Sequence, residues 1–296
     1  MLKGILFIVI AAVCWGLGGV SGQYLHDSHG VDMVWLVMCR QIPAGFIFLL
    51  YASFIQKQDV LGALKNNPVD MFSYSFFGLL GAQLGFYYTI GLCNAATATV
   101  LQYSAPIFVM LWMAFKERRM PSAVELVGVA VAVTGVFLIS THGSLDSLAI
   151  SPEALAIGLI SALSYAFYSI KPVEMLKHYT STTILGWGQL LSGLALIIWR
   201  NPFKPAGNWD LAACLAFAYL IIMATVICYV FFLKGLPIVG PTRASLISCA
   251  EPLSSIIAVV LLLDTRLLLA DYIGMACIIF TVLFLSLNKA KTPQEG

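Results

Sequence analysis

The sequence predicts an all-α integral membrane protein with ten transmembrane helices, arranged as two inverted five-helix repeats. Three observations lead to this fold class: an apolar composition, ten apolar stretches of membrane-spanning length, and a pattern of polar residues that occurs twice. Apolar residues make up 60% of the chain and charged residues only 10%, too few to cover the surface of a water-soluble core. The lipid bilayer is therefore the expected solvent.

Each apolar stretch holds roughly 17–23 residues, which is long enough for a helix to cross a hydrocarbon core of about 30 Å. The ten predicted spans cover residues 4–24, 33–55, 71–93, 96–115, 123–141, 152–171, 181–199, 211–233, 243–263 and 271–288. Because five is an odd number, each half of the chain ends on the opposite side of the membrane from where it began. We therefore expect one repeat over residues 1–145 and a second, inverted repeat over 146–296.

A pattern of residues that ends in proline occurs in the fourth span and again, 146 positions later, in the ninth. Its members at i, i+3, i+4 and i+7 are Thr99, Gln102, Tyr103 and Pro106 in the first copy, and Ser245, Ser248, Cys249 and Pro252 in the second. This spacing places each set on one helical face. Inverted repeats are the architecture of secondary transporters. Duplicated bundles also occur outside transport, so a membrane enzyme or a scaffold remains the alternative of another class.

Positive charge is distributed unevenly among the predicted loops. With a cytoplasmic N-terminus, twelve basic residues lie inside: Lys3, Lys57, Lys65, Lys116, Arg118, Arg119, Lys171, Lys177, Lys234, Arg243, Lys289 and Lys291. Three lie outside: Arg200, Lys204 and Arg266. Basic residues gather on the cytoplasmic side of membrane proteins. We therefore expect a multi-pass protein of the cell membrane, surrounded by lipid, with both termini in the cytoplasm.

Several kinds of chemistry have no motif in this chain. It contains no G-x-x-x-x-G-K-[ST], H-E-x-x-H or G-x-S-x-G sequence. His26, His29 and Asp32 could approach a metal ion, but a solvated loop is the favoured interpretation because a metal site needs a complete ligand set. The seven cysteines are interpreted as packing residues, since none forms a C-x-x-C pair. We expect no metal, no cofactor, no enzymatic activity and no nucleic-acid partner.

Two charged residues, Arg40 and Glu251, lie well inside predicted spans. A charge at the centre of a transmembrane helix costs about 2.5–3.5 kcal/mol on insertion scales, so each should face protein or water. Three interpretations stay open. The residues could form a structural ion pair; they could be functional, with Glu251 carrying a proton or meeting a cationic group and Arg40 meeting an anionic one; or Arg40 could extend alone to the outer interface.

Pro106 and Pro252 occupy equivalent positions in the two repeats. Neither can donate to the carbonyl group four residues earlier, so each half frees one backbone carbonyl near the middle of the membrane. Matched interruptions in the two halves point to the binding site of a transporter, although a kink that only improves packing is the alternative. We predict a cavity lined by the fourth and ninth spans, with Gln102, Tyr103 and Ser248 contacting substrate and the two prolines acting as hinges.

Other candidates are amide and aromatic side chains on the remaining spans. The predicted substrate-binding residues of this kind are Trp15, Gln83, Tyr87, Tyr165, Tyr168, Trp187 and Gln189. Thr225 and Tyr229 share a face of the eighth span. Amides and phenols can hydrogen-bond a polar solute, and aromatic faces can hold an amine or a ring. Any one of them could instead make a contact between helices, and the G-x-x-x-G of Gly81 and Gly85 predicts close packing.

The chain resembles the drug/metabolite transporter superfamily, specifically its ten-helix EamA-type members, over essentially its whole length. The resemblance rests on the duplication and on three segments: AAVCWGLGGVSGQ, GFYYTIGLCNAATATVLQYSAPIFVMLWMAFKERRM and its counterpart CYVFFLKGLPIVGPTRASLISCAEPLSSIIAVVLLLDTRL. An acidic residue after each proline-containing helix is typical of the family. Glu117 fits, and Asp264 stands where glutamate is more usual.

The resemblance implies that helices 1–4 and 6–9 surround a central cavity, while helices 5 and 10 pack outside as scaffold or as contacts of a homodimer. It also implies alternating-access transport of a small-molecule metabolite, with export of amino acids or related compounds favoured. The alternative within transport is proton- or ion-coupled uptake, with Glu251 titrating.

Overall fold

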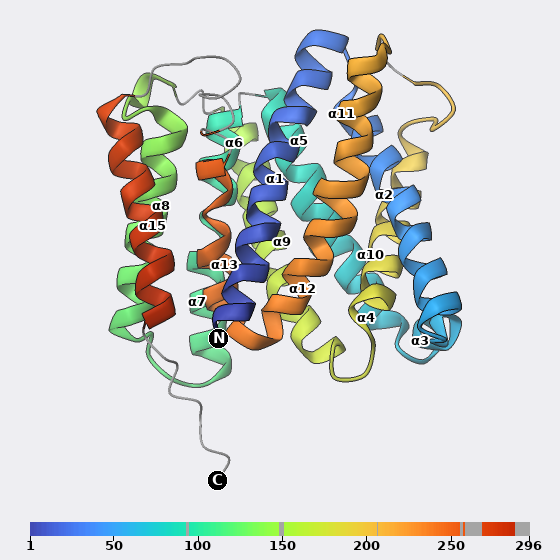
Figure 1. The fold of residues 1–296 in the computed structure, drawn as a ribbon, viewed down its shortest axis with the longest axis horizontal. Coiled ribbons are helices and arrows are strands. Elements are labelled where there is room, and N and C mark those ends of the chain that lie inside the picture. The colour runs from blue at the N-terminus through green and yellow to red at the C-terminus, as the bar shows by residue number, and fades with distance from the viewer. Residues whose placement is uncertain (93–94, 148–150, 206, 255–256, 258–267, 288–296) are drawn as a thin grey trace.

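The computed structural model describes residues 1–296 except 93–94, 148–150, 206, 255–256, 258–267 and 288–296. Most of the described residues are helical, turns and short irregular connections join the helices, and no strand occurs among the described residues. The long helices run side by side along one direction, so both ends of the bundle consist of helix termini and connections (Figure 1). The first predicted feature, an all-α fold, is confirmed.

The helical elements follow the predicted spans in chain order. They are α1 (Leu2–His29), α2 (Met33–Leu50), η1 (Tyr51–Ile55), α3 (Val60–Asn66), α4 (Pro68–Ser73), η2 (Tyr74–Leu80), α5 (Gly81–Leu92), α6 (Ala95–Gln102), α7 (Ala105–Lys116), α8 (Ala123–Thr141), η3 (Leu145–Ser147), α9 (Pro152–Met175), α10 (Ser181–Ala195), η4 (Leu196–Ile198), α11 (Leu211–Ile221), η5 (Ile222–Ile227), α12 (Cys228–Val239), α13 (Pro241–Ser248) and α15 (Leu269–Leu287). Residues 251–254 are also helical.

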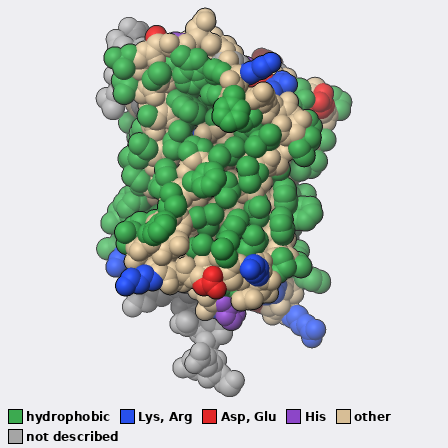
Figure 2. Space-filling view, turned by 90° about the vertical axis from the view of Figure 1, so that its right-hand side faces the viewer, with side chains coloured by type: hydrophobic (Ala, Val, Ile, Leu, Met, Phe, Trp, Pro, Cys, Tyr) green, Lys and Arg blue, Asp and Glu red, His purple; other side chains and the backbone are tan. Residues whose placement is uncertain are grey.

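Six helical segments of the described chain are long and apolar enough to cross a membrane. They are Leu2–His29, Met33–Ile55, Ala98–Lys116, Pro152–Met175, Ser181–Ile198 and Leu211–Val239. Shorter apolar helices cover Ala123–Leu138 and Leu269–Thr281. Figure 2 shows apolar side chains over the middle of the molecule and charged side chains at its two ends, as lipid surroundings require. The chain is a multi-pass membrane protein, and the total of ten crossings stays a prediction.

The two proline-containing spans are interrupted at equivalent positions. Helix α6 ends at Gln102 and α7 begins at Ala105, so Pro106 lies in the first turn of a new helix. The predicted fourth span is present over Ala98–Lys116, and the break falls next to the proline, where a first-turn position lacks only an N–H group that would have no helical partner. In the second half, α13 ends at Ser248, and helix resumes at 251–254 after a two-residue turn. The rest of that span lies largely outside the described residues.

The two breaks have the same backbone hydrogen bond. The amide of Ser104 donates to the carbonyl of Leu101 at 3.2 Å, and the amide of Ala250 donates to that of Ile247 at 3.0 Å. Both bonds join residues three apart, as in a tightened turn at a helix end. The offset between them is again 146 residues, so the matched interruption predicted from the prolines has a matched geometry.

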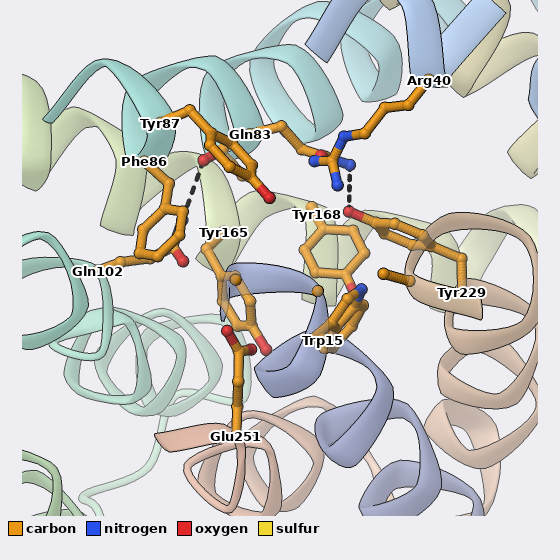
Figure 3. Close-up of a pocket in the computed structure, with 14 residues that line it drawn as sticks. Trp15, Arg40, Gln83, Phe86, Tyr87, Gln102, Tyr165, Tyr168, Tyr229 and Glu251 are labelled. Carbon is orange, nitrogen blue, oxygen red and sulfur yellow. Dashed lines mark hydrogen bonds between the residues drawn. The ribbon is translucent and has the colours of Figure 1, made fainter. Parts of the chain in front are cut away.

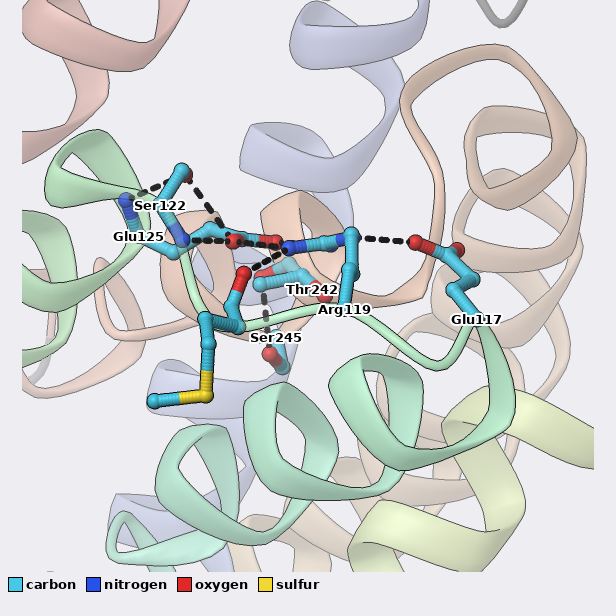
Figure 4. A network of polar contacts seen from close by, with 7 residues as sticks. Glu117, Arg119, Ser122, Glu125, Thr242 and Ser245 are labelled. Carbon is cyan, nitrogen blue, oxygen red and sulfur yellow. Dashed lines mark hydrogen bonds and ion pairs between the residues drawn. The ribbon is translucent and has the colours of Figure 1, made fainter.

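A polar network closes the connection between α7 and α8. Ser122 and Glu125 form a capping box at the start of α8. The guanidinium group of Arg119 donates to both oxygens of Glu125, at 2.7 and 2.6 Å, and to Glu117 at 2.5 Å (Figure 4). Helix α13 packs against both α7 and α8. The network therefore holds this connection beside the interrupted helix of the second half.

The main helix contacts pair elements from the two predicted repeats. Helix α1 packs on α12, α5 on α9, α2 on α10, and α8 on α15 at one edge of the bundle (Figure 1). Small residues allow the α5–α9 approach, since a Cβ atom added to Gly85 would lie 2.8 Å from Ser161 Cβ. The G-x-x-x-G prediction of close packing is confirmed on this face.

Replacing Gly85 by alanine should destabilise the α5–α9 contact. The added methyl group meets Ser161 where no flexible side chain can yield, so we expect Gly85→Ala to cost about 1–3 kcal/mol. Gly91→Ala is the matched control on the same helix, because a Cβ atom there meets nothing within 4 Å. Thermal unfolding in detergent measures both variants. Equal midpoints for the two would contradict the close approach.

Candidate functional site

A cavity lies where α1, α2, α5, α6, α9, η5 and α12 converge with the helical residues 251–254. Its lining contains Trp15, Gly18, Gly19, Arg40, Ala82, Gln83, Phe86, Tyr87, Gln102, Tyr165, Tyr168, Ala224, Tyr229 and Glu251. These residues come from both halves of the chain, and Figure 3 shows the polar side chains directed towards one another. The free volume is about 60 Å³, enough for a few water molecules at about 10–15 Å³ each.

Aromatic rings form most of the cavity wall. Trp15 contacts Tyr229 edge to face with ring centroids 5.1 Å apart, and Tyr165 contacts Tyr168 in the same way at 5.2 Å. Tyr168 also stacks on Phe232 at 5.0 Å. Each such pair contributes about 0.5–1.5 kcal/mol beyond its buried area. The wall is therefore held in place by ring contacts between α1, α9 and α12 rather than by a single helix.

One hydrogen bond joins the two helix breaks. Tyr103 lies at the break between α6 and α7, and its hydroxyl group donates to Glu251 Oε2 at 2.5 Å. Glu251 follows the break after α13. The bond joins a hydroxyl group of the first half to a carboxyl group of the second. The interruptions of the first and second halves are thus in direct contact at the cavity.

Gln102 joins three helices beside this bond. Its Nε2 atom donates to the backbone carbonyl of Ala82 on α5 at 2.9 Å and to Ser161 Oγ on α9 at 2.8 Å. The hydroxyl group of Ser161 donates to the same carbonyl at 2.9 Å. The amide therefore crosslinks the end of α6 to the close α5–α9 contact.

Arg40 and Glu251 enter the cavity from opposite sides (Figure 3). The salt bridges of the described residues do not include a pair between them. Arg40 is 4% exposed, and its guanidinium carbon lies 4.9 Å from the centre of the Tyr87 ring. It is therefore buried against an aromatic face, without a direct salt bridge to Glu251 among the described contacts.

The structure brings most of the predicted substrate-binding residues together in this cavity. Trp15, Gln83, Tyr87, Tyr165 and Tyr168 line the cavity together with Arg40, Gln102 and Glu251. Gln83 donates its amide N–H to the Tyr229 hydroxyl group. Tyr229 was not among the substrate-binding predictions, although it shares a helical face with Thr225, and that shared face was the available signal.

Four predicted substrate-binding residues lie outside the cavity lining: Tyr103, Trp187, Gln189 and Ser248. Tyr103 is buried behind the lining and contacts it through Glu251. Trp187 donates its indole N–H to the carbonyl of Val60 at 2.7 Å, which anchors α10 to the connection after η1. Gln189 is fully buried on α10, the helix that packs on α2. Ser248 donates to the carbonyl of Ala244 at 2.9 Å, within its own helix. Within the described part of the chain, no cluster of His, Cys, Asp and Glu could hold a metal ion.

A helical bundle with apolar sides and charged side chains at its two ends defines a class, the polytopic membrane proteins. The profile of the EamA-like transporter family matches residues 2–141 and again residues 153–287. The chain belongs to the EamA-like transporter family.

Two curated relatives and one solved structure show the extent of the similarity. The "Uncharacterized inner membrane transporter YicL" of Salmonella typhimurium is 36% identical, over 99% of this chain and 98% of the relative. The "Uncharacterized transporter YcbK" of Bacillus subtilis is 25% identical, over 99% and 95%. A crystal structure of 16% identity covers 97% of both chains with a TM-score of 0.80, and it shows the fold alone.

Removing the Gln102 amide should loosen the cavity from the α5–α9 contact. We expect Gln102→Ala to lower the free energy of unfolding by about 1–3 kcal/mol, because two buried hydrogen bonds are lost. Gln58→Ala is the control, since that amide is exposed and makes one long bond of 3.4 Å. Thermal unfolding measures both. A midpoint for Gln102→Ala that equals the control would show that the crosslink carries no stability.

Proposed function

We propose that the chain is a secondary transporter of small polar metabolites that works by alternating access, with the cavity as its substrate site. One observation carries the proposal. The two matched helix breaks, one from each half, meet at the cavity through the hydrogen bond from Tyr103 to Glu251. In secondary transporters the substrate site lies where interrupted helices of two repeats meet. Export of amino acids or related compounds is the favoured direction, on the family resemblance.

The proposal includes ten helices in two inverted repeats, over 1–145 and 146–296. It is supported by the family profile, which matches once in each half. It is also supported by the helix contacts. If α1 corresponds to α9, and α5 to α12, exchanging the halves turns the α1–α12 contact into the α9–α5 contact, and both are present.

The size of the cavity supports a mechanism with moving helices. Pockets that bind small molecules usually enclose about 300–1,000 Å³, whereas this cavity has about 60 Å³. A metabolite larger than a few water molecules can therefore enter only if the lining helices separate. Rocking of the two halves about the breaks at Pro106 and Pro252 would open the site to one side at a time.

The orientation in the cell membrane is also part of the proposal. We place both termini in the cytoplasm, which puts Lys3, Lys57, Lys116 and Arg119 on the inner side, as the positive-inside rule favours. Lipid covers the apolar sides of the bundle, and α8 and α15 at its edge are the surface that a second copy would contact.

Flux through purified protein tests the proposed function. Thermal stabilisation across amino acids, amines, sugars, nucleosides and carboxylates first identifies a ligand, since binding to the folded state raises the unfolding midpoint. We expect proteoliposomes that contain the chain to exchange this ligand across the membrane, and liposomes without protein to show none. Binding without flux would favour the membrane enzyme or scaffold.

Proton or ion coupling is the second candidate, because the acidic group that lines the cavity, Glu251, is held by a hydroxyl group of the other half. We expect Glu251→Gln to abolish accumulation of solute against a gradient and to leave exchange intact. An amide keeps the hydrogen bond but cannot release a proton. Glu153→Gln, at an exposed helix start, is the control. Equal loss of accumulation and exchange, or loss of neither, would contradict coupling through Glu251.

A further inference from the structure

Arg40 lacks a hydrogen-bond acceptor within the described part of the chain. None of its five N–H donors takes part in a hydrogen bond or salt bridge there, and its Nε atom is buried without a partner. The side chain is 4% exposed and points into the cavity (Figure 3). A buried cation of this kind is costly unless a complementary group is supplied.

The neighbours of Arg40 supply only part of that complement. The Tyr87 ring, 4.9 Å from the guanidinium carbon, offers a cation–π contact, but a ring face accepts none of the N–H groups. Glu251 is the one acidic residue of the cavity lining, and it accepts a hydrogen bond from Tyr103 on the far side. The missing acceptor must therefore come with whatever enters the cavity.

The chemistry of that acceptor follows from the guanidinium group. Its planar array of donors matches the two oxygens of a carboxylate, which it binds through two parallel hydrogen bonds. Three further buried atoms lack hydrogen-bond partners in this cavity: Oε1 of Gln83 and the hydroxyl groups of Tyr165 and Tyr168. An entering molecule with hydrogen-bonding groups could pair with them. The surrounding rings favour an apolar or aromatic body.

We propose that Arg40 is the anchor of the substrate site and that the substrate class is compact carboxylates whose organic body lies among the aromatic rings. This inference rests on the proposed function and specifies its ligand. Arg40 binds the carboxylate against the Tyr87 ring, while Gln83 and Tyr168 meet its polar substituents. A site built around unpaired donors rejects analogues that lack the acceptor, because the donors then stay unpaired.

Four probes that share one skeleton separate the charges a ligand can carry. They are 3-phenylpropionate, phenylalanine, 3-phenylpropylamine and 3-phenylpropionamide, and their binding is measured by thermal stabilisation of the purified full chain. We expect both carboxylates to stabilise the protein, and the amine and the amide to need at least about tenfold higher concentrations. Stabilisation by the amine or the amide that equals that of the carboxylates overturns the inference, as does no stabilisation by either carboxylate.

Variants of Arg40 connect the preference to this side chain. Arg40→Gln should weaken carboxylate binding by about 10- to 100-fold, and Arg40→Lys should weaken it less, because it keeps the charge but loses the planar pair of donors. Lys65→Gln, at an exposed position of the short helix α3, is the control and should bind as the wild type does. An unchanged preference for carboxylates in Arg40→Gln overturns the anchor.

The ligand-free stability of Arg40→Gln separates a binding role from a structural one. Because Arg40 has no acceptor among the described residues, its removal should leave the unfolding midpoint unchanged or raise it. A clear decrease would mean that Arg40 supports the fold, which contradicts the inference. Flux of each binding probe in proteoliposomes distinguishes the two proposals. Flux of a non-carboxylate supports the transporter function but contradicts the carboxylate substrate class. Binding without flux contradicts the transporter function itself.

Discussion

The structure depends on the way two interrupted helices are joined in the interior of a membrane protein. In lipid, a backbone that leaves helical geometry must be enclosed by protein or by water. Here the breaks after Gln102 and Ser248 are enclosed together, and the hydroxyl group of Tyr103 reaches Glu251 from one break to the other. The cavity lies beside the point where the two breaks meet, with Gln102 and Glu251 in its lining.

Around the breaks, some side chains stabilise the cavity wall and others carry polar groups that a ligand could bind. Aromatic contacts such as Trp15–Tyr229 and Tyr165–Tyr168 fix the wall without using its polar atoms. The amide of Gln102 is fully committed to α5 and α9, whereas the guanidinium group of Arg40 is not committed to any described acceptor. The aromatic contacts and the Gln102 crosslink thus stabilise the wall. The guanidinium group of Arg40 keeps hydrogen-bond donors that a solute in the cavity could bind.

The sequence predicted what depends on length and spacing, and less of what depends on neighbours. Bilayer thickness sets the length of a span, so the long helices could be located from hydropathy, and the two prolines located the breaks. The residues at which α6 ends and α7 begins were not predicted, because the end of α6 is held by tertiary partners of Gln102, namely Ala82 and Ser161. Periodicity places Trp187 on a helical face but does not say which helix that face meets. For the same reason Tyr229 was not predicted to line the cavity, since its hydrogen-bond partner Gln83 is distant in the sequence.

Accessibility of the cavity from the two sides of the membrane tests the central claim most directly. Gly19 lines the cavity, and a Cβ atom there meets nothing within 4 Å, so Gly19→Cys fits in a background whose seven cysteines are replaced by alanine. We predict that a membrane-impermeant thiol reagent labels this cysteine from either face, in proportions that a bound ligand changes. Labelling from one face only, with and without ligand, would contradict alternating access and show that the cavity is a fixed pocket.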